Sequence, residues 1–220
     1  YRAALHVAGE NASLLTFACS LADYGDLQDR FEPVGFVGNS MGFYTALALS
    51  GALPLEDAIT LVDTMGAYQQ GNVIGGQILY PIHDEHWRTD PIQRARVDET
   101  LAGIIELGHT AEWSIDLGGY AVLGADRAGL DLLKERLVPV TRGSRTFPIQ
   151  LPMHSAFHTS LMQATSERAF AELGQLRFRA PELPLIDGRG HVFRPRWTDP
   201  TALRDYTLGH QVVAPFDFTR

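Results

Sequence analysis

The chain reads PVGFVGNSMGFYTALALSG from Pro33 to Gly51, and this stretch decides the fold. Its first part, up to Gly38, is short, apolar and bounded by glycine, which predicts a buried strand. Its last part spaces apolar residues along one face of a helix that Gly51 ends. Between them, residues 38–42 form a Gly-x-Ser-x-Gly motif centred on Ser40. A strand, a sharp turn and a helix in this order predict a nucleophile elbow, with a plain glycine-rich turn as the alternative.

An elbow explains the residue types of the motif. Its two glycines let the chain turn tightly, so that the hydroxyl of Ser40 stands clear of the sheet. The turn also points that hydroxyl at the positive end of the following helix, whose N–H groups stabilise an oxyanion. The motif therefore indicates covalent chemistry at a serine.

Helices and strands alternate on both sides of the motif. The spacing of apolar residues predicts a strand at 183–186 and helices at 11–24, 55–70, 160–173 and 201–210. Such alternation is typical of a parallel α/β sheet.

The middle of the chain has a different order of elements. Residues 91–107 and 126–137 read as helices, and strands are predicted at 76–82, 112–117, 120–124 and 145–151. The order β-α-β-β-α-β is that of a ferredoxin-like domain. We therefore predict an α/β fold in which a hydrolase-like large domain with a parallel sheet (residues 1–73 and 153–220) is interrupted by a ferredoxin-like α+β small domain (residues 74–152).

Composition and charge exclude several classes of protein. The 220 residues carry a formal net charge of −8, which disfavours binding to the phosphate backbone of a nucleic acid. No apolar run approaches the roughly 20 residues that cross a bilayer, so no membrane association is predicted. The single cysteine, Cys19, excludes a disulfide framework and a Cys-rich zinc site, and a reducing, cytoplasmic setting fits best. The glycine-rich loops that bind nucleotide phosphates are missing from the sequence.

A serine hydroxyl needs a base to remove its proton, and the chain has eight histidines. His83 and His86 follow the first strand of the small domain and are interpreted as surface residues, because no third metal ligand accompanies them. His154 and His158 lie where the chain returns to the large domain, at the border where ligands usually bind. Spacing alone does not choose between these two histidines.

Four blocks of sequence resemble the malonyl-CoA:acyl carrier protein transacylase family, which includes the acyltransferase domains of fatty acid and polyketide synthases. The first block begins at Val34, contains the serine motif and continues to residue 58. The second is LPMHSAFHTSLM at 151–162, and the others are 115–124 and 199–218. The blocks follow the order of the family and cover most of the chain.

The resemblance implies that His158 is the base of a Ser–His dyad and takes the proton of Ser40. The serine would attack an acyl-CoA thioester, and the phosphopantetheine thiol of an acyl carrier protein would then attack the acyl-serine ester. The amide of Met41 would contribute to the oxyanion hole, and a group at Gln211 would hold the other nitrogen of the histidine. Acyl-CoA is then a substrate and the carrier protein a partner, and neither a bound cofactor nor a metal is expected.

The chain departs from the family in two places that bear on catalysis. The second oxyanion donor of the family comes from an N-terminal Gly-Gln-Gly motif, which is missing from the 39 residues before Ser40. We expect an omitted upstream segment, because a sheet without its first strand exposes an edge and core. Met65 stands where an arginine usually pairs with the malonyl carboxylate, although packing on its helix would also explain a methionine. A carboxylate buried without a cation costs several kcal/mol, so an uncharged acyl group is expected.

Three further residues are expected to contact the acyl group or line its entrance. Asn39 stands where the family usually has His or Gln. Phe43 replaces the usual Glu and is expected to make the entrance less polar. Phe157 is typical of malonyl-using members, in which it limits branched acyl groups. Acetyl, or another small neutral acyl group, reconciles Phe157 with Met65.

Other functions fit the same residues. A thioester hydrolase on this scaffold would replace the carrier thiol by water, and a non-catalytic docking domain would keep only the fold. An ordinary α/β-hydrolase fits less well, because no acid is evident between the serine and the histidine. A carrier protein would be acidic, as this chain is, so docking is expected to use a local basic patch formed by Arg189, Arg194 and Arg196.

Overall fold

A computed structural model describes residues 2, 6, 9–70 and 73–219 of the chain. The chain divides into a large unit, Tyr1–Asn72 with Thr165–Val212, and a small unit, Val73–Ala164 with Val213–Arg220. These bounds differ from the expected domains of 1–73 with 153–220 and of 74–152. Residues 153–164 and 213–220 group with the small unit, because the loop before residue 160 and the last strand both bond to the small unit's sheet.

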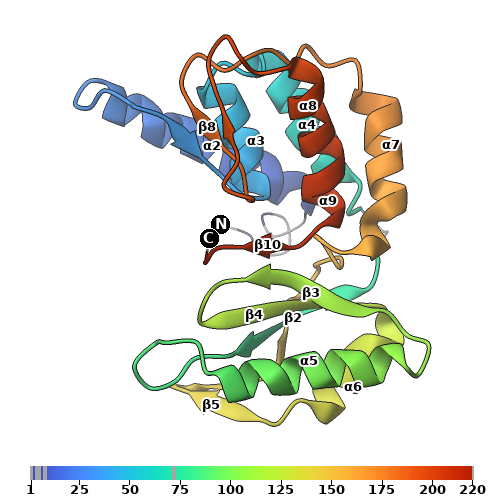
Figure 1. Ribbon diagram of the computed structural model, residues 1–220. Helices are drawn as coiled ribbons and strands as arrows, with labels where there is room; N and C mark the ends of the chain where they lie inside the picture. The colour runs from blue at the N-terminus through green and yellow to red at the C-terminus, as the bar shows by residue number, and fades with distance from the viewer. Residues whose placement is uncertain (1, 3–5, 7–8, 71–72, 220) are drawn as a thin grey trace. The chain divides into compact units, whose positions relative to one another are not determined.

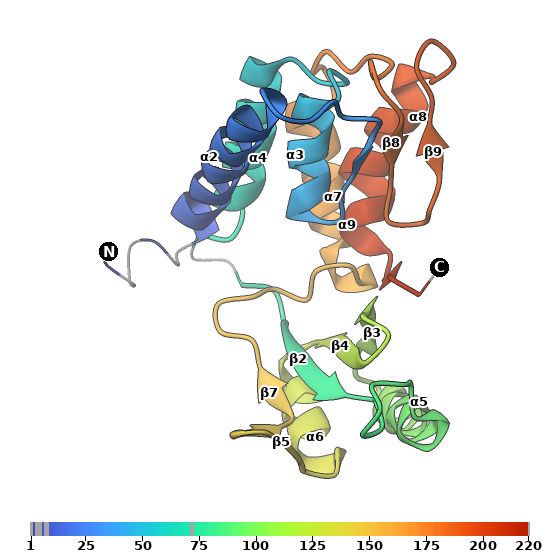
Figure 2. The same cartoon turned by 90° about the vertical axis from the view of Figure 1, so that its left-hand side faces the viewer.

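The large unit combines helices with a three-stranded sheet. Helices α2, α3 and α4 contact one another and lie side by side (Figure 2). The helices of this unit are α2 (Gly9–Gln28), α3 (Met41–Leu49), α4 (Leu55–Ala67), α7 (Gln163–Leu173), α8 (Pro200–Asp205), a π-helix (Tyr206–His210) and α9 (Gln211–Val213).

The large unit's sheet joins segments that are distant in sequence. Its order is β1 (Phe36–Val37), β8 (Leu185–Ile186) and β9 (Val192–Phe193). Strand β1 is parallel to β8, as expected for an α/β sheet, whereas β9 is antiparallel and was not predicted. In the described part of the sheet β1 is an edge strand, and Val37 is 70% exposed.

Helix α3 directly follows β1 and packs beside it. It is apolar on all sides, and its residues from Phe43 to Leu47 are buried. A helix that is apolar all round belongs in a core. Helix α4 instead buries one stripe, with Ala58, Leu61 and Val62 inside and Glu56 and Asp63 exposed.

The small unit has the predicted ferredoxin-like arrangement. Its main sheet has the order β10-β3-β4-β2-β7, and the neighbouring pairs among β3, β4, β2 and β7 are antiparallel. Strand β10 extends this sheet by pairing in parallel with β3. The elements are β2 (Gly76–Pro81), α5 (Pro91–Ile105), β3 (Ala111–Asp116), β4 (Tyr120–Ala125), α6 (Arg127–Arg136), β5 (Val140–Arg142), β6 (Arg145–Phe147), β7 (Ile149–Gln150), a 3₁₀ turn (Ser160–Met162) and β10 (Phe216–Asp217).

The two faces of the small sheet have different neighbours. Helices α5 and α6 pack on one face (Figure 1), where Ile78, Tyr80 and Leu123 form part of the core. Because successive residues of a strand face opposite sides of the sheet, their neighbours Gln77 and Gly124 face the other side. The loop that carries His158 lies on that opposite face.

Several predicted elements differ in detail. The single strand expected at 145–151 is two strands, β6 and β7, separated by Pro148, and β6 forms a hairpin with β5. The helix expected at 201–210 is α8 followed by the π-helix. Among the described residues, no helix has both the length and the apolar character that crossing a bilayer requires.

Candidate active site

Ser40 lies in the sharp turn between β1 and α3. Its backbone has φ 55° and ψ −127°, a region that residues with a Cβ rarely occupy. Gly38 makes the turn possible, because a Cβ there would lie 2.3 Å from the carbonyl oxygen of Gly42. A Cβ at Gly42 would meet no described atom within 4 Å, so close packing requires only the first glycine of the motif.

Helix α3 begins directly after Ser40, which brings its N-terminal amides to the turn. The amide of Gly42 donates to the carbonyl of Asn39 at 2.9 Å, and the amide of Phe43 donates to the carbonyl of Ser40 at 3.0 Å. Met41 is the first residue of the helix, and its half-buried side chain packs against the core. The N-terminus of a helix carries partial positive charge, so this end of α3 can stabilise negative charge beside the serine.

Asn39, before Ser40, and Phe43, in the first turn of α3, have different surroundings. The Oδ1 atom of Asn39 is buried and has no hydrogen-bond partner among the described residues. The ring of Phe43 is fully buried and meets the ring of Tyr206 edge-on at a centroid distance of 4.8 Å. Our expectation that Phe43 makes the entrance less polar is therefore wrong, because the ring belongs to the large unit's core.

Met65 lies in the last turns of α4. Its side chain is half-buried and packs against the core of the large unit. This contact accounts for a methionine by packing, one of the two explanations that the sequence left open. Met65 is thus a neutral, packed side chain at the position for which the sequence resemblance implies an arginine in the family.

The structure separates the two histidines between which spacing did not choose. His154 is exposed, and its Nδ1 atom lies 3.1 Å from the carbonyl oxygen of Pro152. His158 is 4% exposed and has a left-handed backbone with φ 59°. Its ring lies 4.2 Å, between centroids, from the ring of Phe216. A buried imidazole held against an aromatic ring has a restricted orientation, as a positioned base requires. His158 meets this requirement better than the exposed His154 does.

Phe157 bridges the two histidines. Its half-buried ring meets the ring of His154 edge-on at 6.2 Å and lies 6.1 Å from the ring of His158. Its carbonyl oxygen accepts a hydrogen bond from the hydroxyl of Ser114 at 2.8 Å. The loop around His158 is thus fixed to the small unit's sheet by side chain and backbone.

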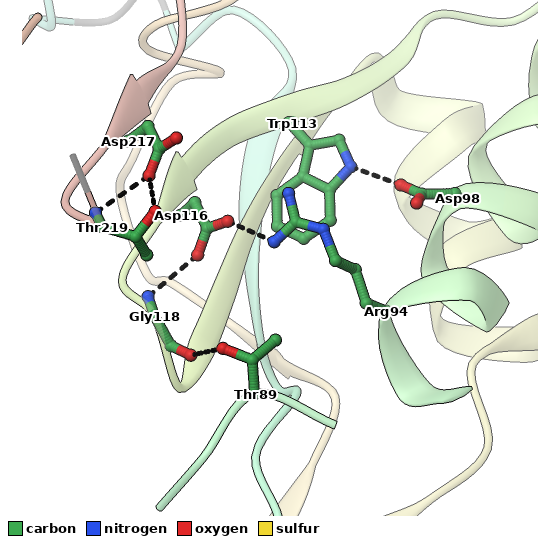
Figure 3. Close-up of polar contacts among 8 residues, drawn as sticks. All are labelled: Thr89, Arg94, Asp98, Trp113, Asp116, Gly118, Asp217 and Thr219. Atoms are coloured by element: carbon green, nitrogen blue, oxygen red, sulfur yellow. Dashed lines mark hydrogen bonds and ion pairs between the residues drawn. The ribbon is translucent and has the colours of Figure 1, made fainter. Parts of the chain in front are cut away.

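The strand that carries Phe216 pairs with the end of β3, beside a polar cluster (Figure 3). The carboxylate of Asp116 accepts a hydrogen bond from the amide of Gly118 at 2.8 Å and pairs with Arg94. The guanidinium of Arg94 lies 4.5 Å over the ring of Trp113. Beside them, the amide of Phe218 donates to the carbonyl of Asp116 at 2.9 Å, which fixes the end of β10. The backbone pairing of β10 with β3 places Phe216 against His158.

Gln211 directly follows the π-helix and is 1% exposed. Burial raises the pKa of Tyr44 to about 12, and a hydrogen-bonding interaction with Gln211 opposes that rise. π-Helices are rare and occur often at functional sites. Gln211 and the serine turn belong to the large unit, whereas His158 and Phe157 belong to the small unit.

Sequence analysis missed two polar side chains and misplaced a third. Gln77 and Ser114 are buried on β2 and β3, and both bond to the loop before His158. Their only signal in the sequence is a polar residue inside an apolar strand. His83, expected at the surface, is 4% exposed and stacks on Trp87 at 4.3 Å between ring centroids, whereas His86 is exposed. Within the described residues, no three His, Cys, Asp or Glu side chains gather as metal ligands.

Comparison with known proteins finds relatives in the family that the sequence motifs resemble. No family model matches the chain. It is 24% identical over 213 residues to the malonyl CoA-acyl carrier protein transacylase of Salmonella typhimurium, an alignment that covers 94% of this chain and 63% of that protein. The chain is similar to malonyl-CoA:acyl carrier protein transacylases. It spans 63% of the length of this curated relative.

Solved structures of transacylases share the fold of this chain. FabD from Acinetobacter baumannii superimposes with a TM-score of 0.77 at 23% identity, covering 98% of this chain and 65% of that one. A malonyl-transacylase in complex with AntF, a type II polyketide synthase acyl-carrier protein, gives a TM-score of 0.79 at 17% identity, covering 99% and 67%. The mixed α/β fold, with its ferredoxin-like part, is therefore that of the transacylases.

Proposed function

We propose that the chain forms the catalytic part of an acyltransferase that moves a small acyl group from coenzyme A to the phosphopantetheine thiol of an acyl carrier protein. The observation that carries the proposal is the strained turn at Ser40, which stands at the N-terminus of α3 in a chain similar to transacylases. The transacylase that shares this fold in complex with AntF supports a carrier protein as the partner. The exposed free thiol of Cys19 suits a reducing, cytoplasmic setting.

The proposed reaction has two balanced steps. In the first, His158 accepts the hydroxyl proton of Ser40 while the oxygen attacks the thioester carbon, and the C–S bond breaks to release coenzyme A with that proton. In the second, His158 accepts the thiol proton of the carrier protein, whose sulfur attacks the acyl-serine ester. The C–O bond then breaks, and Ser40 regains its proton. The amide of Met41 would stabilise the oxyanion of both steps, and Gln211 would orient His158.

The acyl group that we propose is small and neutral. Met65 packs against the large unit's core and offers no positive charge to a malonyl carboxylate. A buried carboxylate without a cation costs several kcal/mol, and each 1.4 kcal/mol lowers selectivity by about tenfold. Phe157, with its ring fixed between two histidines, would limit branched groups.

Intact-mass analysis after exposure to acetyl-, malonyl- and propionyl-CoA tests the proposal. We expect a mass increase of one acetyl group, absent in Ser40→Ala, and discharge only on addition of a carrier protein that bears phosphopantetheine. Rapid loss of the acyl group in buffer alone would instead support the thioester hydrolase. If the serine remains unmodified by every donor while the protein is folded, the acyltransferase proposal is wrong.

A further inference from the structure

The peptide bond in front of His158 is held by two buried side chains. The carbonyl oxygen of Phe157 accepts hydrogen bonds from the hydroxyl of Ser114 at 2.8 Å and from Nε2 of Gln77 at 3.2 Å. Nε2 of Gln77 also donates to the oxygen of Ser114 at 2.7 Å, which closes a triangle of three bonds. Gln77 and Ser114 are 3% and 0% exposed, so water does not compete for these bonds.

The sheet is shaped to bring these groups to the loop. The register of β3 against β4 shifts between Trp113 and Ile115, so that Ser114 is the extra residue of a β-bulge. Bulges occur often beside active sites, where they change the direction of a side chain. The hydroxyl of Ser114 thereby points at the Phe157 carbonyl.

A glycine on the central strand lets the loop approach between the two donors. Gly124 of β4 is paired with Gln77 of β2 on one side, and β3 lies on its other side. A Cβ at Gly124 would lie 2.5 Å from the methyl carbon of Thr159. One residue further along, the amide of Ser160 donates to Glu112 of β3 at 2.9 Å. The loop on both sides of His158 is thus seated on three neighbouring strands.

The fixed peptide matters because His158 has a φ of 59°. A residue with a Cβ adopts this conformation only when its surroundings impose it. The Phe157 carbonyl belongs to the peptide plane from which that φ is measured, so its two hydrogen bonds fix the plane against which the Cα–Cβ bond of His158 is oriented. A polar amide and hydroxyl inside an apolar sheet are costly unless they are bonded, and here the bonds described for these two side chains either join them to each other or end on the Phe157 carbonyl.

We propose that Gln77 and Ser114 are positioning residues that orient the imidazole of His158. They act through the Phe157–His158 peptide and have no contact with the reacting atoms. The effect on catalysis rests on the proposed function, in which His158 is the base, whereas the effect on the ring orientation does not.

Ser114→Ala and Gln77→Met each remove one donor and nearly preserve side-chain volume. Ser50→Ala is the matched control, because Ser50 is equally buried and its hydroxyl donates to a backbone carbonyl, that of Leu47, at the far end of α3. The first readout is the histidine ring spectrum of protein labelled with ¹⁵N-histidine, in which loss of a signal in His158→Gln identifies His158. The second is the rate of acyl-Ser40 formation at increasing acyl-CoA concentration.

We expect Ser114→Ala and Gln77→Met to shift the ring signals of His158 and leave those of the other seven histidines in place. The maximal acylation rate should fall about tenfold, with the acyl-CoA concentration at half-maximal rate unchanged, since each variant removes one of the two buried hydrogen bonds to the Phe157 carbonyl. Ser50→Ala should match the wild type in both readouts. If one donor variant fails to fold, the other carries the test.

Unshifted His158 signals in the folded donor variants would overturn the proposal, as would an equal shift in Ser50→Ala. A wild-type protein that accepts no acyl group refutes the acyltransferase function instead. In that case the ring spectrum still decides whether Gln77 and Ser114 orient His158.

Discussion

The backbone of Ser40 gives the most direct test of strain at a single residue. Its φ of 55° and ψ of −127° lie in a region that is open almost only to glycine. Ser40→Gly removes the Cβ that makes this conformation costly, whereas Ser40→Ala keeps it. We expect Ser40→Gly to be more stable than Ser40→Ala by about 1 kcal/mol, measured by urea unfolding. Equal stabilities would show that the turn stores no strain, and neither variant should accept an acyl group.

Met65 tests the basis of acyl selectivity. Met65→Arg places a cation at the position where the family pairs an arginine with the malonyl carboxylate. We expect the ratio of malonyl to acetyl transfer to Ser40 to rise about tenfold, measured by intact mass after short incubations with both donors. Met65→Gln, which has a similar length and no charge, should leave the ratio unchanged. A wild-type protein that prefers malonyl to acetyl would contradict the argument from Met65.

Helix α4 is tied to the segment after α7 by an ion pair at its N-terminus. The carboxylate of Asp57 accepts hydrogen bonds from the Arg177 side chain at 2.8 and 3.0 Å and from its backbone amide at 2.7 Å. The hydrogen bond from the Arg177 side chain lowers the pKa of Asp57. A carboxyl group with a lowered pKa in the folded state stabilises the fold above its unfolded pKa, and this stabilisation is lost as the pH falls through the folded pKa.

Asp57→Asn should therefore destabilise the protein by about 1 kcal/mol at pH 7, a modest value because the Arg177 side chain is well exposed. The difference from the wild type should shrink as the pH falls below about 4, measured by urea unfolding across the pH range. Glu56→Gln is the control, since the exposed Glu56 makes a single contact with Arg177. A difference that does not vary with pH would assign the loss to packing.

Elements with strong local patterns could be predicted from the sequence, and elements that depend on distant partners could not. The stripe of α4 and the order of the ferredoxin-like elements follow from periodicity alone. The two-residue strands β9 and β10 exist only because of what they pair with. The π-helix before Gln211 leaves no trace in the spacing of apolar residues. Helix α3 is apolar all round, so its pattern could not show that Phe43 faces the core.

The candidate site likewise contains residues that a local sequence pattern indicates and residues whose role depends on distant partners. The glycine pattern around Ser40 is local and readable, and the four blocks of family resemblance selected His158 from two histidines. Gln77 and Ser114 acquire a role only when β2 and β3 lie on either side of β4. Their positions depend on the fold and on a β-bulge, so a single sequence cannot indicate them.

At the scale of the whole molecule, charge limits how an acidic partner could dock. The chain has a net charge of −8, but residues 189–196 form a local basic stretch. The guanidinium of Arg189 already has partners within the chain, because it pairs with the buried carboxylate of Asp187 at 2.6 Å and lies 4.4 Å over the ring of Tyr206. Arg194 and Arg196 are exposed, and Trp197 beside them is 87% exposed.

Arg194 and Arg196 are therefore the residues of this patch that we expect to attract an acidic carrier protein. Reversing both, with Arg194→Glu and Arg196→Glu, should raise the KM for the carrier roughly fivefold at low salt and less at high salt, because screening weakens exposed charges. Formation of acyl-Ser40 from acyl-CoA should be unaffected. Arg127→Glu with Arg145→Glu makes the same change of charge at exposed positions of the small unit and controls for net charge. Equal KM values for the two double variants would show that the carrier responds to overall charge and not to this patch.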